Sequence, residues 1–331
     1  MRRRQIIALL GGAGVLPVAA GAQPVPGSFR IGVLTFAGSQ TAPIWKVFSA
    51  ELARLGYVEG RNLAIMFRSA EGRIDDRLPA LADEIVRTAP DLIFAVSTPA
   101  ALALRQHTKT IPIVFTFVAD PVGAGLVGSL TRPGGNATGL SVLNLELAGK
   151  RVEFLREILP GLKRVAVLWM AADVGLAIDT LSAIQRETES NARTLGIAPD
   201  LVKVAEVEQL DSAFAAMRAS GHRAIVILPS LDASRNYRRL VELSTTHKLA
   251  SIGDNRPFVE MGGLIAYGAN FEEHMRNAAG YVARILAGAR AADLPVQQPT
   301  KFDLIINAKT ARALGLTIPP SMLGRADEVI E

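Results

Sequence analysis

The chain has 331 residues, of which 49% are hydrophobic and 20% are charged, a balance that supports large buried cores and excludes a disordered protein. Its length indicates about two domains. It carries a formal net charge of +5 and no cysteine, which excludes disulfides and thiol-attached lipids.

The first 22 residues have the pattern of a cleaved signal peptide. Residues 2–4 (RRR) form a basic start, an apolar stretch follows, and residues 20–22 (AGA) supply a small-residue end. We expect cleavage near Gln23, after export by either the Sec or the twin-arginine route. A single membrane anchor is the alternative, but the apolar stretch is short and is broken by Pro17.

Removal of this leader leaves 33 of the 36 basic side chains against 31 acidic ones, a net charge of +2. The chain shows no basic stripe and no helix-turn-helix pattern, so we expect no nucleic-acid partner. No later segment is long and apolar enough to span a bilayer. An exported chain of this kind is expected to be a soluble protein of the periplasm.

From residue 29 onward, apolar runs alternate with helical patterns. Strands are expected at 29–36, 61–70, 91–97 and 111–118, and helices begin near Pro43, Leu78 and Pro99. The runs are nearly continuous in apolar residues instead of alternating with polar ones. Such runs are typical of strands that are covered on both faces, as in a parallel sheet.

A second series begins after the turn-rich segment 131–139 (TRPGGNATG). It predicts a helix with Ala148, Val152, Leu155 and Leu159 at helical spacing, then strands at 164–170, 200–207, 224–230, 249–255, 263–269 and 301–307, with helices at 176–195, 208–219, 233–247 and 271–288 and a short helix near the end. Two such series predict an α/β fold of two Rossmann-like, doubly wound lobes with parallel sheets.

The residues that follow the predicted strands are the candidate ligand-binding residues. In open α/β sheets, ligands bind outside the carboxyl ends of the strands, where helix N-termini present free N–H groups. The candidates are Phe36, Gly38, Ser39, Ser97, Thr98, Asp120, Pro121, Ser230, Asp232, Asp254, Arg256, Phe258 and Tyr267. This set of hydroxyls, acids, one arginine and a few aromatic rings suits binding more than catalysis.

The sequence contains none of the metal-binding, nucleophile or phosphate-binding motifs that would indicate an enzyme. The four histidines lie scattered along predicted helices and form no short-spaced pair, which argues against a metal site. No serine stands in a Gly-x-Ser-x-Gly elbow, and no phosphate-binding glycine loop follows a predicted strand. We therefore expect no catalytic residue, no metal and no cofactor.

Several candidates also have a purely structural interpretation. The alternatives are a helix cap at Thr98 with Pro99 in the first turn, a turn at Asp120-Pro121, a helix cap at Asp232, a solvated loop around Arg256 and Phe258, and hinge packing at Tyr267. At Thr98 the two interpretations are compatible, because a helix N-terminus that faces a ligand can bind a carboxylate and still be capped.

Several motifs carry a resemblance to a known family. Among them are GYVEGRN at 56–62, RPGGN at 132–136, AYGANF at 266–271 and, near the C-terminus, PTKF at 299–302 and LGLTIPP at 314–320. With these motifs the chain resembles the substrate-binding proteins of ABC transporters, in the family that includes tryptophan- and tyrosine-binding members. The resemblance runs from the leader to the C-terminus.

The resemblance implies a type I periplasmic-binding fold, in which two lobes close on a ligand and the chain crosses between them three times. Lobe one is expected to comprise residues 28–142 and 266–296, and lobe two residues 143–265 and 297–331. The resemblance also implies an inner-membrane ABC permease and its ATPase as partners. By position, it assigns the ligand-facing loops to residues 36–39, 97–98, 120–121, 230–232 and 254–258.

We therefore expect a monomeric solute receptor of an ABC importer that is not an enzyme. Its ligand is expected to be a small carboxylate, such as an amino acid or an aromatic acid, whose carboxylate lies on the helix N-terminus at residues 97–99. Phe36 or Phe258 would cover the apolar part, and Asp120 or Asp254 would bind an ammonium group. The alternatives are a periplasmic enzyme that uses these two carboxylates for acid–base chemistry and a ligand-presenting sensor partner.

Overall fold

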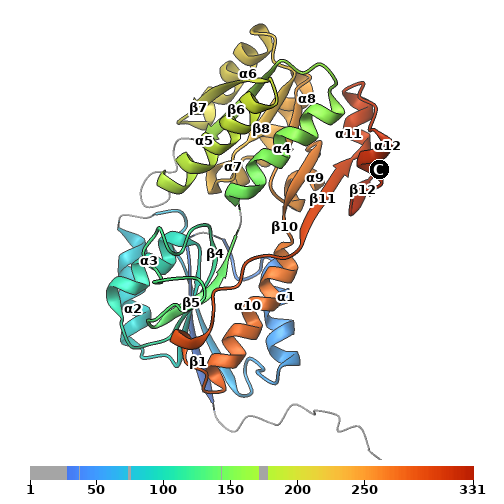
Figure 1. The fold of residues 1–331 in the computed structure, drawn as a ribbon. Helices are drawn as coiled ribbons and strands as arrows, with labels where there is room; N and C mark the ends of the chain where they lie inside the picture. Colours follow the sequence, from blue (N-terminus) through green and yellow to red (C-terminus); the bar gives the residue numbers. More distant parts are fainter. Residues whose placement is uncertain (1–27, 37, 74–75, 143, 171–177) are drawn as a thin grey trace, which may run out of the picture.

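The structure is a computed structural model that describes residues 28–331 except 37, 74–75, 143 and 171–177. The predicted signal peptide and its cleavage site lie outside the described residues. In the described part, no helix is both long and apolar enough to cross a membrane. The chain folds around two separate sheets (Figure 1).

Lobe one is the five-stranded parallel sheet with the helices that cover it. Its strands are β1 (Phe29–Thr35), β2 (Leu63–Ser69), β3 (Leu92–Val96), β4 (Ile113–Val118) and β5 (Ala137–Ser141), in the order β2-β1-β3-β4-β5. Its helices are α1 (Pro43–Arg54), α2 (Arg77–Arg87), α3 (Thr98–His107) and α10 (Phe271–Leu286), followed by the 3₁₀ turn η2 (Ala291–Asp293).

The core of lobe one explains the continuous apolar strands. Successive side chains of a strand point to opposite faces, so Val33 packs with α1 and α10, and Leu34 packs with α2 and α3. In β3, Phe94 and Ala95 divide in the same way between the two cores. Both faces are covered, as the sequence predicts for a parallel sheet.

Lobe two is the seven-stranded sheet with its helices. Its strands are β6 (Arg164–Met170), β7 (Ala198–Val204), β8 (Ala224–Ile227), β9 (Ala250–Gly253), β10 (Ile265–Ala269), β11 (Phe302–Asn307) and β12 (Glu328–Ile330), in the order β12-β11-β10-β9-β8-β6-β7. Its helices are α4 (Asn144–Ile158), α5 (Ile178–Thr194), α6 (Leu210–Ala219) after the 3₁₀ turn η1 (Val207–Gln209), α7 (Leu231–Arg235), α8 (Tyr237–Thr246), α9 (Arg256–Glu260), α11 (Ala308–Ala313) and α12 (Pro320–Leu323).

Two cores flank this second sheet as well. Val167 of β6 packs with α4, α5 and the C-terminal helices, whereas Leu168 packs with α6, α8 and α9. The sheet is not wholly parallel, because β10 pairs with β11 in the antiparallel direction. The helix expected at 233–247 is two helices that meet at Asn236, and the polar loop expected around Arg256 is the short helix α9.

The chain passes between the lobes from β5 to α4, from β10 to α10, and from η2 to β11 (Figure 1). The last of these segments runs beside β5, where the N–H of Gln297 donates to the Gly139 oxygen at 2.9 Å. The lobe boundary expected at residue 266 is wrong, because it would cut β10. All of β10 pairs with β11 in lobe two, and the crossing lies after Ala269.

Candidate ligand-binding site

The carboxyl ends of both sheets point toward the crossings. β5 and β10 lead directly into them, and the strands parallel to these two end at the same edges. The parallel part of each sheet has the same order, β2-β1-β3-β4-β5 in lobe one and β7-β6-β8-β9-β10 in lobe two. In such sheets the ligand site lies where the strand order reverses, between β1 and β3 and between β6 and β8.

The reversal point of lobe one brings together three of its loops. The Phe36 N–H donates to the Val96 oxygen at 3.5 Å, which places the loop after β1 beside the end of β3. The Gly72 N–H donates to the Phe36 oxygen at 2.9 Å and adds the loop after β2. Gly38 and Ser39 are exposed, and the Ser39 hydroxyl is 2.8 Å from that of Thr41 in the same loop.

Ser97 caps helix α3, not Thr98. The Ser97 Oγ accepts from the Ala100 N–H at 3.4 Å, and Thr98 is the first residue of the helix. Ser97 has φ +105° and ψ 159°, a region that is costly for any residue with a β-carbon and is concentrated at functional sites. Among the described residues, neither the N–H nor the hydroxyl of Thr98 has a hydrogen-bond partner. Thr98 is 8% exposed, and both groups keep their hydrogen-bonding capacity for a ligand.

Asp120 and Pro121 form a local turn. The exposed Asp120 accepts through Oδ1 from the Gly123 N–H at 2.8 Å. Pro121 is buried, and its carbonyl oxygen accepts from the N–H of Leu126 at 2.9 Å. These contacts favour the turn interpretation, because the carboxylate is already engaged by its own loop.

In lobe two, Ser230 and Asp232 begin helix α7. The Ser230 Oγ caps the helix by accepting from the Ala233 N–H at 3.0 Å, so Asp232 is not the cap. Asp232 lies in the first turn, with Oδ1 4.0 Å from Nη1 of Arg235. Both candidates are partly exposed at the reversal point of the second sheet.

A buried polar network lies behind this edge and contains Asp254. Its Oδ1 accepts from the Tyr237 hydroxyl at 2.9 Å and from Asn255 Nδ2 at 3.0 Å. The wholly buried Arg151 of α4 donates through Nε to the Tyr267 oxygen at 3.0 Å. Burial lowers the pKa of Arg151, and the negative charge of Asp254 opposes that shift. Burial also raises the pKa of Tyr237, which stays a neutral donor.

Three candidates have other partners. Arg256 is ion-paired with Glu328 of β12 and is 3.6 Å from Glu260. Phe258 is fully buried in the core of lobe two, so the expectation that it covers a ligand conflicts with its burial. The Tyr267 ring lies 5.0 Å from that of Phe154, which supports the hinge-packing interpretation.

The sequence reasoning missed an aromatic cluster at the end of β4. The Phe117 ring lies 4.8 Å from Phe271 and 4.8 Å from His274, both in the first turn of α10. Phe117 has φ +56°, which is uncommon for a residue with a β-carbon. Its position just before the end of a predicted strand was the available signal.

One contact joins the lobes at the site. A β-carbon at Gly72 would lie 2.6 Å from Nη1 and 2.7 Å from Nη2 of Arg235, so this guanidinium reaches the backbone of lobe one. Through Arg235, helix α7 adjoins the loop that is hydrogen-bonded to Phe36. The loops after β1, β2 and β8 therefore meet in one region.

This region has the chemistry of a binding site. It offers hydroxyls, carboxylates and, at a helix N-terminus, the Thr98 N–H, which has no partner among the described residues. No group of three or more His, Cys, Asp or Glu side chains in the described part could hold a metal ion. The arrangement can bind an anion at α3 and a cation near the acids of lobe two.

Comparison with known proteins identifies what the chain is similar to. A family model described as ABC transporter substrate binding protein matches residues 36–330. A tyrosine-binding protein of Clostridioides difficile (strain R20291) is 29% identical over 275 residues, which cover 82% of this chain and 76% of that protein.

Solved structures agree with this match. An ABC domain from Streptococcus pneumonia in complex with L-Trp has a TM-score of 0.81 at 28% identity, covering 92% of this chain and 100% of that chain. A conserved domain protein from Vibrio cholerae O1 biovar eltor has a TM-score of 0.81 at 30% identity, covering 91% and 99%. The fold is therefore that of a type I periplasmic-binding protein.

Proposed function

Because this chain belongs to the family of ABC transporter substrate-binding proteins, we propose that it captures an amino acid or an aromatic acid between its lobes for import. The family consists of binding proteins, so the chain is not an enzyme. The choice of ligand rests on the N-terminus of α3, where the N–H and the hydroxyl of Thr98 have no partner among the described residues.

The carboxylate of the ligand binds at this N-terminus. A helix N-terminus carries a partial positive charge, and at α3 the Thr98 N–H and hydroxyl supply the donors. The strained Ser97 fixes the direction in which the helix starts. Phe36, half-buried beside Ser97, covers the apolar part of the ligand.

The ammonium group of an amino acid binds near the acids of lobe two. Asp254 uses Oδ1 for Tyr237 and Asn255, and Asp232 is partly exposed. Both residues follow strands that end at the same edge of the sheet. The names of the relatives support an amino acid, since one is a tyrosine-binding protein and another was crystallised with L-Trp.

The family works with a membrane permease and is typically periplasmic or extracellular. For this chain we propose an inner-membrane ABC permease and its ATPase as partners, with the monomeric protein in the periplasm. The basic and apolar leader at residues 1–22 supports export.

A thermal-shift screen of amino acids, small aromatic acids and nucleobases tests the proposal. A ligand that binds only the folded protein raises its melting temperature in proportion to the logarithm of ligand concentration. We expect a shift with one or more amino acids or aromatic acids, and none with their amides, which lack the carboxylate. Shifts with nucleobases or amides alone would contradict the proposed ligand class.

At the residue level, Thr98→Val is expected to weaken binding of the ligand about tenfold or more. Hydrogen bonds to charged groups contribute roughly 1.5–3 kcal/mol, and about 1.4 kcal/mol corresponds to a factor of ten. The melting temperature of the empty protein should hardly change, because Ser97 is the cap. Calorimetric titration measures the first effect and thermal unfolding the second. Unchanged affinity with lower stability would show that Thr98 serves the helix alone.

Gly72→Ala is expected to weaken ligand binding about threefold to tenfold, because the new β-carbon would displace the Arg235 guanidinium and remove its contact with lobe one. The matched control is Gly60→Ala. Gly60 has φ +79° against +86° at Gly72, but nothing lies within 4 Å of its β-carbon position. Both variants should lose similar stability, about 1 kcal/mol. Equal affinities in the two variants would show that Arg235 plays no part in closure.

A further inference from the structure

A polar hollow lies at the opposite end of lobe two from the ligand loops. It measures about 160 Å³ and is lined by Arg218, Arg223 and Lys248 together with Ala250 and three leucines. Arg223 directly precedes β8 and Lys248 lies just before β9, so the hollow is at the amino ends of these strands. The ligand loops follow the carboxyl ends of the same strands.

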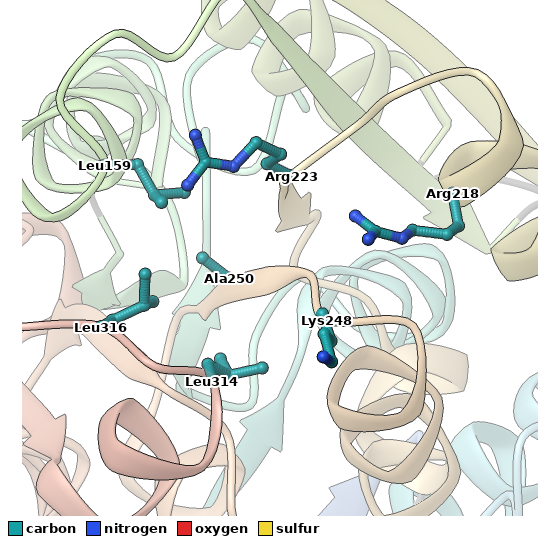
Figure 2. Close-up of a pocket in the computed structure, with 7 residues that line it drawn as sticks. All are labelled: Leu159, Arg218, Arg223, Lys248, Ala250, Leu314 and Leu316. Atoms are coloured by element: carbon teal, nitrogen blue, oxygen red, sulfur yellow. The ribbon is translucent and has the colours of Figure 1, made fainter.

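Figure 2 shows how the two kinds of side chain are arranged. Leu314 and Leu316 lie on one side of the hollow, Arg218 and Lys248 lie on the other, and Arg223 lies between Leu159 and Arg218. The hollow therefore presents cationic groups beside an apolar wall.

The three cations have no acidic partner in the described part of the chain: none takes part in an ion pair found there. The acid near this end of the sheet, Asp200, is engaged by Arg164 at 3.0 Å and by His222 at 2.9 Å. The helix dipole stabilises the charge of Arg218 at the carboxyl end of α6 and that of Lys248 after the carboxyl end of α8. Arg223 lies at neither helix end, so no helix dipole accounts for its unpaired charge.

Lys248 occupies a left-handed backbone position that favours glycine, although Ala89, with φ +46°, fills the same position after α2. It has φ +53°, and its N–H donates to the Thr245 oxygen at 3.1 Å in the turn after α8. The turn after α6 has the same pattern, with Gly221 at φ +81° donating to the Arg218 oxygen at 3.0 Å. A side chain is unfavourable in this conformation. Lys248 therefore adds a charge to the hollow at the expense of backbone strain.

We propose that this hollow binds a small dianion with a short apolar portion, independently of the ligand between the lobes. The arginines form charge-assisted hydrogen bonds with two carboxylates or with a phosphate group. Lys248 adds a point charge, and Leu314 and Leu316 contact the hydrocarbon part. Three cations match a dianion better than a monoanion, because each extra pairing lowers the repulsion among them.

Calorimetric titration with glutarate at low salt tests the site, with butyrate as the monoanion and glutaramide as the neutral analogue. We expect glutarate to bind about tenfold more tightly than butyrate, and glutaramide not to bind, because each lost charge-assisted bond costs about that factor. Titration with inorganic phosphate shows whether the dianion is a dicarboxylate or a phosphate group. Binding as tight as that of glutarate assigns the site to phosphate groups. Added salt should weaken binding of either dianion.

Variants assign the binding to the hollow. Arg223→Gln and Lys248→Gly should each weaken glutarate binding about tenfold, whereas Arg186→Gln, an exposed arginine of α5, should not. Lys248→Gly should leave the melting temperature equal or higher, since glycine relaxes the turn. Wild-type affinity in both hollow variants would overturn the proposal. So would a loss of glutarate binding in Thr98→Val alone, which would place the dianion between the lobes.

Discussion

Replacing Arg151 with methionine is expected to lower the free energy of unfolding by about 3–5 kcal/mol. The Arg151 side chain is wholly buried, and the negative charge of Asp254, which is only 8% exposed, stabilises its positive charge. Without the guanidinium, the carboxylate keeps the hydrogen bonds from Tyr237 and Asn255 but loses its buried counter-charge. A buried carboxylate without a counter-charge is far more costly than a missing contact. Urea unfolding of the empty protein measures the loss.

A double variant separates charge from packing. Arg151→Met combined with Asp254→Asn should recover at least half of the loss, because no uncompensated charge remains. Arg156→Met is the matched control, an exposed arginine of the same helix, and should stay within about 0.5 kcal/mol of the wild type. Fully additive losses in the double variant would show that the two charges do not interact.

The sequence predicted the fold well because its signals are local and periodic. The continuous apolar runs at 92–96 and 164–170 required cover on both faces, and the structure places helices there. The prediction failed where a single residue interrupts a helix. Asn236 separates α7 from α8 inside what read as one helix.

The candidate site was harder to predict because strand ends do not reveal side-chain directions. Phe258 follows a strand as a ligand-facing residue would, yet Asn255 caps α9 and the ring turns into the core. Arg151 lies one turn before Leu155 of the predicted apolar stripe, which was a readable signal of burial. The contact of Arg235 with Gly72 joins distant segments, and no local pattern predicts it.

Lowering the pH from 7.5 is expected to destabilise the protein through His274. Burial lowers the pKa of His274 from 6.5 to about 4. Below pH 6.5 the unfolded chain takes up a proton that the folded protein does not accept until about pH 4. The stability contributed by this residue is thus complete above pH 6.5 and is lost as the pH falls toward 4. The loss amounts to about 2 kcal/mol at pH 5 and about 3 kcal/mol at pH 4.

The surroundings of the His274 ring explain why the folded protein does not bind this proton until about pH 4. His274 is 3% exposed, packs against Phe117, and its Nε2 has no hydrogen-bond partner among the described residues. It also lies in the first turn of α10, where the helix dipole opposes a positive charge. In the described part of the chain, no carboxylate is hydrogen-bonded to that nitrogen to stabilise the imidazolium.

His274→Leu isolates this contribution, because leucine fills the space and does not titrate. We expect the stability difference between wild type and variant to shift by about 2 kcal/mol in favour of the variant between pH 7.5 and pH 5. Salt at 0.5 M should leave the shift in place, since its cause is burial and not a distant charge. Urea unfolding at each pH provides the measurement. A parallel decline of both proteins would mean that other groups cause the acid sensitivity and that the His274 imidazole accepts a proton while folded.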